Sequence, residues 1–255
     1  MKWYLPALAG FIGLAAPLWA QEQVVAGISQ DRIEINANFD GSDLLIYGAV
    51  KRETPIPADS QLEVIVTVEG PSDVEVVRRK SSYLGLWINS QTVSVDSAPS
   101  FYSVAASGRF EDVISNTEDL RHGISLRQVI RFIGAPAHVE NAQDFKEALI
   151  RLRTAEGVYS NHDNSVQVSQ QTLFRTTVDL PANLVEGNYK TRIYLLRNRA
   201  VVGLYQKAIF VRKVGLERWL FRLAHNDPAY YGILALAVAA LSGWAASALF
   251  GLLRR

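Results

Sequence analysis

The stretch LFRTTVDLPANLVEGNYKTRIYLLRNRAVVGLYQKAIFVR, residues 173–212, decides the fold of this chain. Apolar and polar residues alternate through three segments, 173–180, 189–197 and 200–212, as they do in half-buried strands. Asn198-Arg199 lies between the last two segments and predicts a tight turn. This part of the chain is therefore expected to form antiparallel β-structure.

The connection before the second of these strands has a pattern of its own. The spacing of Leu184, Gly187 and Tyr189 resembles the tyrosine corner of immunoglobulin-like sandwiches. In that corner the hydroxyl of a tyrosine at the start of a strand forms a hydrogen bond with the backbone a few residues upstream. We therefore predict an immunoglobulin-like β-sandwich and give Tyr189 an architectural role, not a catalytic one.

Upstream segments show the same period of two and are separated by turn-forming residues. We expect strands near 33–37, 44–51, 62–68 and 74–80 in a first sandwich part, 21–109, and a second part at 161–213. Between them, 110–160 reads as a helical insertion, because 124–133 and 142–153 have helical spacing. One sandwich and two β-modules bridged by helices both fit this pattern.

The C-terminal segment 228–253 contains no charged residue and is long enough to cross a bilayer as a helix. Pro228 suits the first helical position, and Tyr230 and Tyr231 suit the membrane interface. We predict one transmembrane helix followed by a cytoplasmic tail, 254–255.

The N-terminal segment 1–20 resembles a secretory signal, with Lys2 before an apolar run and a cleavage site after Ala20. A retained N-terminal anchor is the alternative. Export of the N-terminus predicts a type I protein of the inner membrane with its ectodomain in the periplasm. By the positive-inside rule, the opposite orientation is favoured by the cations Arg212, Lys213, Arg218 and Arg222. We give the signal segment more weight than these cations.

Two patterns near the membrane concern contacts. Small residues recur every four positions along one side of the predicted span, which would let another helix approach closely. They are Ala235, Ala239, Gly243, Ser247 and Gly251. Before the span, 214–227 has the pattern of an amphipathic helix lying on the outer surface, with Trp219 on its apolar side and Arg218 and Arg222 on its polar side. A plain connecting helix is the alternative.

Composition limits the function. All 25 acidic residues and all but three of the 26 basic ones lie between Glu22 and Asp227, so the ectodomain lacks the basic surface of a nucleic-acid-binding protein. No cysteine is present, so the fold depends on its own core. We find no motif that indicates catalytic, cofactor-binding or metal-binding residues. For this reason we favour a protein that is not an enzyme. A membrane-tethered enzyme is the alternative, with His122, His138 or His162 in a site between sandwich and insertion.

A run of three cations, Arg78, Arg79 and Lys80, follows an apolar pair in one predicted strand. These side chains are candidates for contact with an anion or a partner, because guanidinium groups match carboxylates and oxyanions. The nearby aromatic residues Tyr83, Trp87, Phe101 and Tyr102 are expected to pack in the core.

Several strings resemble the alphaproteobacterial putative transmembrane protein family, and the resemblance covers the mature chain. They are 25–33 (VAGISQDRI), 39–52 (FDGSDLLIYGAVKR), 99–104 (PSFYSV) and the C-terminal span. The resemblance implies a single-pass protein often encoded beside a permease of the sulfite-exporter TauE/SafE type. It brings no functional residues with it. We expect a non-catalytic accessory or binding subunit whose partners are inner-membrane lipid and a permease, or a second copy of itself.

Overall fold

The computed structural model describes residues 22–36, 39–53, 55–56, 60–131, 142–214 and 216–253. The predicted signal segment, His138 and the tail 254–255 lie outside these ranges. The strands are β1 (Gln23–Ile28), β2 (Arg32–Ile35), β3 (Ser42–Lys51), β4 (Glu63–Glu69), β5 (Ser72–Tyr83), β6 (Leu86–Pro99), β7 (Tyr102–Ala106), β8 (Tyr159–His162), β9 (Gln167–Ser169), β10 (Leu173–Leu180), β11 (Gly187–Arg197) and β12 (Ala200–Lys213). The helices are α1 (Phe110–Val113), α2 (Asn116–His122), α3 (Leu126–Val129), α4 (Ala142–Ala155), α5 (Leu216–Asn226) and α6 (Pro228–Leu253). The prediction of a mainly β chain with one C-terminal apolar helix is confirmed.

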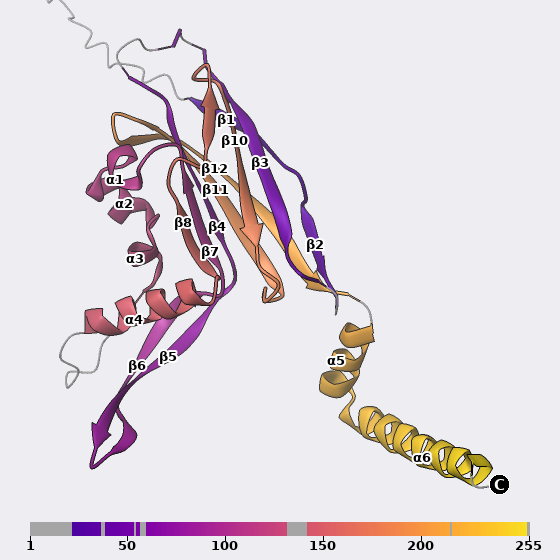
Figure 1. Cartoon of the computed structure of the whole chain (residues 1–255). Helices are drawn as coiled ribbons and strands as arrows, with labels where there is room; N and C mark the ends of the chain where they lie inside the picture. Colours follow the sequence, from indigo (N-terminus) through magenta and orange to yellow (C-terminus); the bar gives the residue numbers. More distant parts are fainter. Residues whose placement is uncertain are drawn as a thin grey trace, which may run out of the picture.

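Two sheets make the body of the protein (Figure 1). One has four strands in the order β1-β3-β10-β9, and the other has six in the order β2-β12-β11-β4-β7-β8. Most neighbours are antiparallel, but β2 pairs with β12 and β8 pairs with β7 in parallel. Both sheets combine strands from the first and second strand-rich parts, so the two parts form one body.

The burial pattern explains why these segments form strands. In β10 every second side chain is buried, as in a strand with one face on a core and one in water. In β4 five consecutive side chains are buried, because both faces of this central strand are covered. Buried residues of both sheets, among them Ile46, Val66, Ile193 and Val211, belong to a single hydrophobic core.

The corner before β11 has the expected hydrogen bond. The Tyr189 hydroxyl donates to the Val185 carbonyl at 2.9 Å, and the ring is buried against Phe101. Burial raises the pKa of this hydroxyl, which therefore stays protonated and donating. Tyr189 joins the connection to the body.

The helices α1 to α4 follow β7 and precede β8, and they differ from the expectation in one place. The helix expected at 124–133 is a single turn, α3. Gly123 ends α2 in the left-handed conformation (φ 61°), and the Asp119 carboxylate accepts from the Ile124 and Ser125 amides, so the chain turns here.

The polar run at 160–165 follows the helices and begins in a strand. Its first three residues are part of β8 and pair in parallel with β7. The edge of the six-stranded sheet offers free backbone groups to this segment, and pairing with them satisfies its own.

The two longest strands of the first part, β5 and β6, belong to neither main sheet. Among the described residues their strand ladder is with each other, apart from an isolated bridge between Ser97 of β6 and Arg131, and they form a twisted ribbon that projects from the body past α4 (Figure 1). Near the body, Val77, Val93 and Val95 are buried, whereas from Ser82 to Ser90 every side chain is exposed.

Candidate functional site

The predicted cationic run lies beside a groove between the ribbon and α4. Phe145 and Leu149 of α4 are buried, and Phe145 lines the groove together with Val77 of β5. Arg153 at the end of α4 forms an ion pair with Glu75 of β5. These contacts hold the helix along the ribbon and leave a cavity of about 640 Å³ next to them.

The groove carries more positive than negative charge. Arg78, Arg79 and Lys80 line it from β5, and Arg151 lines it from α4. Asp144 and Glu147 also line it, but Glu147 lies 3.6 Å from Arg127. Within the described residues, none of the three cations of β5 forms an ion pair. The groove can therefore attract an anionic group.

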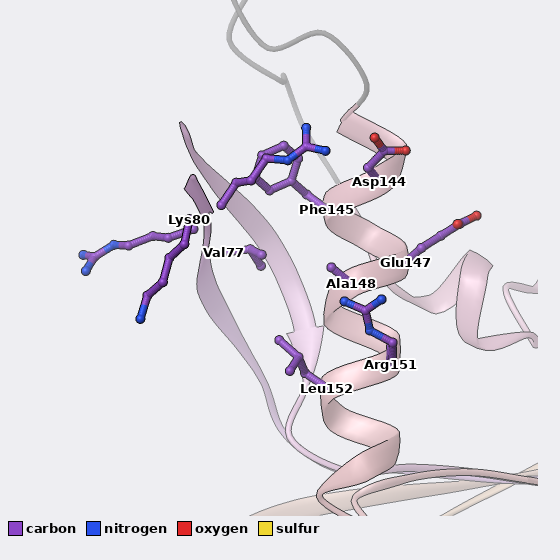
Figure 2. Close-up of a pocket in the computed structure, with 10 residues that line it drawn as sticks. Val77, Lys80, Asp144, Phe145, Glu147, Ala148, Arg151 and Leu152 are labelled. Carbon is purple, nitrogen blue, oxygen red and sulfur yellow. The ribbon is translucent and has the colours of Figure 1, made fainter. Parts of the chain in front are cut away.

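The side chains of Arg78, Arg79 and Lys80 do not converge on one binding position. Figure 2 shows Val77 pointing toward α4 and Lys80 pointing away from it. Successive side chains of a strand alternate between its faces, so the run covers both sides of the ribbon. This geometry is typical of a charged surface and differs from a closed pocket for a small anion.

Two of the four aromatic residues predicted to pack in the core lie on the ribbon instead. Phe101 and Tyr102 are buried, as expected of core aromatics. Tyr83 and Trp87 lie instead near the end of the ribbon, and Trp87 is 72% exposed. The signal available in the sequence was Leu84-Gly85, a two-residue turn that places its neighbours at a hairpin tip.

A second cavity, of about 600 Å³, lies between the helices and the six-stranded sheet, where the alternative reading puts an enzyme site. His122 and Arg192 line it, and Arg192 donates to the Glu69 carboxylate at 2.7 Å. The His122 ring packs edge-on against Tyr194, and its Nε2 lies 3.4 Å from Glu118. Glu118 also accepts from the Val201 amide, so these contacts join α2 to β12.

The predicted histidines do not converge. His122 lines this cavity, whereas His162 lies on β8 and does not line it. Burial raises the pKa of Tyr102, whose hydroxyl donates to the Ile124 carbonyl at 2.6 Å, so this nearby phenol stays protonated. In the part of the chain that the structure describes, no group of three or more His, Asp or Glu side chains could hold a metal ion.

The C-terminal helix α6 is the other candidate surface. Its first 20 residues, Pro228–Ser247, have the length and apolar composition of a membrane span, and none of that window is buried. At 1.5 Å per residue it reaches about 30 Å, the thickness of a hydrocarbon core. Of the small residues on one side of the helix, Ala235, Ala239, Gly243 and Ser247 are exposed. The exposure of Gly251 lies outside what the structure describes.

The helix α5 precedes this span, and residues near the junction have interfacial chemistry. Trp219, Tyr230 and Tyr231 are all exposed. Phe221 stacks on His225 with ring centres 4.2 Å apart. The side chains of Arg218 and Arg222 lie outside the described part of the chain.

Comparison with known protein families gives one match that covers most of the chain. Residues 23–251 match the model of a family described as Putative transmembrane protein (Alph_Pro_TM). No curated protein sequence matches. The matched range includes the two-sheet body, the ribbon and nearly all of α6.

Proposed function

This chain belongs to the putative transmembrane protein family, and from that premise we propose that it is a single-pass accessory subunit of an inner-membrane complex. In this proposal α6 crosses the membrane once and carries the β body on the periplasmic side. The protein works by binding another membrane protein and not by catalysis. The partner we propose is a permease, with an anion exporter of the sulfite type as the specific case.

The exposure of α6 is the observation that supports this proposal. A span with no buried residue must be covered by lipid, by another helix or by both. The line from Ala235 to Ser247 presents only small side chains, and between apolar helices such a line allows close backbone approach. Trp244, which is exposed on the same helix, could pack beside a partner at the same depth.

The direction of insertion comes from the two ends of the chain. A secretory signal at 1–20 would export the body, and the basic tail would then stay in the cytoplasm. A reporter fused after Arg255 tests this: an enzyme active only in the cytoplasm is expected to work there, and one active only in the periplasm is not.

The proposed contact is tested by purifying the full chain from membranes in mild detergent, with mass spectrometry of the proteins that accompany it. Replacing Gly243 and Ser247 by Leu is expected to remove a stoichiometric partner, because two large side chains block close approach. The matched control replaces Ala245 and Ala248 by Leu, which adds similar bulk to the opposite side of the helix.

Two results would contradict the accessory role. A chain that purifies alone, or only with copies of itself, removes the permease from the proposal. A Gly243→Leu, Ser247→Leu variant that retains its partner as well as the Ala245, Ala248 control shows that the small residues do not form the contact.

A further inference from the structure

The end of the β5–β6 ribbon exposes an apolar tip. Tyr83 pairs with Leu86 across the hairpin, and Leu84-Gly85 forms the turn. Leu84 is 88% exposed and Leu86 is 70% exposed. With Trp87 and Ile88, five large apolar side chains stand in water within six residues.

These side chains surround the tip on both faces. Tyr83 and Leu86 share one face of the hairpin, whereas Trp87 pairs with Ser82 on the other. A strand pair that docks on a rigid protein surface buries one face and keeps the other polar. A tip with large apolar side chains on both faces fits a fluid apolar layer better.

The turn itself uses a residue that does not favour its conformation. Leu84 has φ 51°, in the left-handed region that Gly and Asn adopt readily and a leucine does not. Asn would suit this position before Gly85, since Asn-Gly is the preferred pair of such turns. A leucine held there with 88% of its surface exposed indicates a role that its apolar side chain performs.

A polar and cationic zone follows directly behind the tip. Ser81, Ser82 and Asn89 come first, and then the exposed cations Arg78, Arg79 and Lys80, which form no ion pair within the described residues. An apolar end with Trp and Tyr, followed by cations, matches the order of layers in an anionic bilayer, from hydrocarbon to phosphates.

We propose that the β5–β6 tip inserts into the outer face of the bilayer that α6 crosses, with Leu84, Leu86 and Trp87 among the acyl chains and Arg78, Arg79 and Lys80 at the anionic headgroups. The protein would then touch its membrane at two places. In Figure 1 the ribbon leaves the lower end of the body on one side, and α5 and α6 leave it on the other. Because α6 keeps the body at the membrane, a small apolar tip suffices for a stable contact.

This inference rests on the membrane span of the proposed function but not on the accessory role. The absence of cysteine allows a single cysteine to be introduced and labelled in the full chain. We would label Leu84→Cys with a bimane fluorophore and reconstitute the protein into vesicles that contain a lipid-borne quencher. The vesicles are phosphatidylcholine alone, or phosphatidylcholine mixed equally with phosphatidylglycerol.

Two further labels serve as references. Ala240→Cys, within α6, reports the span, and Leu120→Cys, an exposed position on α2, reports a side chain in water. We expect the label at 84 to be quenched by lipid in the anionic vesicles nearly as strongly as the label at 240. Replacing Arg78, Arg79 and Lys80 by Gln should lower the ratio of inserted to free tip by about fivefold for each cation removed.

Leu84→Asn provides a variant that does not disturb the fold, because Asn suits the left-handed turn. With a label at Trp87→Cys, this substitution is expected to lower lipid quenching while the circular dichroism spectrum stays unchanged. Equal quenching with and without the Leu84→Asn substitution would argue that the apex does not drive insertion.

Three further outcomes would each overturn the membrane span, the tip contact or both. A label at 240 outside the lipid overturns the span and the tip contact together. A label at 240 in lipid with one at 84 as wet as the label at 120 overturns the tip contact alone. A label at 84 that is shielded from water only when another protein is present shows a protein docking site in place of the membrane.

Discussion

Two hairpins of this protein have the same turn and opposite surroundings. In β11–β12 the turn residues Asn198 and Arg199 have φ 49° and 64°, and in β5–β6 Leu84 and Gly85 have φ 51° and 82°. The first hairpin lies inside the six-stranded sheet, and the second leaves the body with only its own partner strand. Local turn geometry therefore makes a hairpin without deciding where it packs.

The cations next to the two turns differ in the same way. Arg197 is buried at the end of β11 and contacts Glu22 at 3.0 Å, and Arg199 donates to the Glu111 and Ile114 carbonyls. The cations of β5 are exposed and form no ion pair with any described residue. The body hairpin uses its charges to join segments of one chain, and the ribbon leaves its charges available to something outside it.

The largest effect is expected from breaking the buried charge cluster. Glu22 contacts both Arg52, at 2.8 Å, and Arg197, and all three side chains are about nine-tenths buried. Replacing Glu22 by Gln leaves two guanidinium groups in the interior without a counter-charge. We expect the free energy of unfolding to fall by about 3–5 kcal/mol, measured by urea denaturation of the full chain in detergent.

Arg79→Gln on the ribbon is the matched control, because it also replaces one charged side chain by Gln. Its expected change is within about 0.5 kcal/mol, as for most exposed positions. A loss as large as that of Glu22→Gln would mean that the ribbon cations stabilise the fold.

The next effect compares two leucines near their turns. Leu195 of β11 is fully buried, whereas Leu86 begins β6 in water. Leu195→Ala is expected to lower the unfolding free energy by about 3 kcal/mol through lost burial and the cavity left behind. Leu86→Ala should change it by less than about 0.5 kcal/mol. Similar losses at both sites would mean that the tip packs on the body in solution.

Much of the fold followed from local sequence patterns. The segments predicted at 173–180 and around Asn198-Arg199 match β10 and the β11–β12 turn, because alternation and turn chemistry are local properties. The length of the helix at α3 was overestimated. The Asp119 carboxylate and Gly123 end the preceding helix and turn the chain, and the spacing of apolar residues carries no information on this turn.

The ribbon could not be placed from sequence for a different reason. Its strand pattern was visible, but strand pairing into a sheet depends on distant segments, and alternation is identical in a core strand and a free one. For the same reason the sequence pattern led to the prediction that Trp87 is buried in the core. Exposure of a large side chain is decided by what packs over it, and that information lies elsewhere in the chain.

A third test concerns pH. Burial raises the pKa of Tyr102, Tyr159, Tyr189 and Tyr194, all in the body. Unfolded tyrosines ionise at about pH 10, so the folded chain holds protons that the unfolded chain has released above that pH. The stability from these groups is fully present below about pH 10 and is lost as the pH rises through the folded-state pKa values. We expect unfolding at high pH, followed by circular dichroism and phenolate absorbance.

Tyr189→Phe separates one tyrosine from the other three. The variant loses the hydrogen bond to Val185, which lowers the unfolding free energy at pH 7 by about 1 kcal/mol. Its stability should also fall less steeply above about pH 10, because one fewer proton is released on unfolding. Tyr83→Phe at the ribbon tip should leave the unfolding free energy at pH 7 unchanged. An unchanged slope for Tyr189→Phe would contradict the assigned cause.

The smallest effect exchanges the turn residues of the two hairpins. Leu84→Asn should stabilise the ribbon by about 0.5–1 kcal/mol, because Asn adopts the left-handed conformation more readily than Leu. Asn198→Leu should destabilise the body hairpin by a similar amount. Hydrogen exchange of the amides of β5 and β6, compared with those of β11 and β12, measures the two changes separately. If Leu84→Asn gives a more protected ribbon, the natural leucine is a residue that the hairpin retains against its own stability. If it gives a less protected one, Leu84 has a packing partner on the protein, and the difference between the two hairpins is smaller than their exposure indicates.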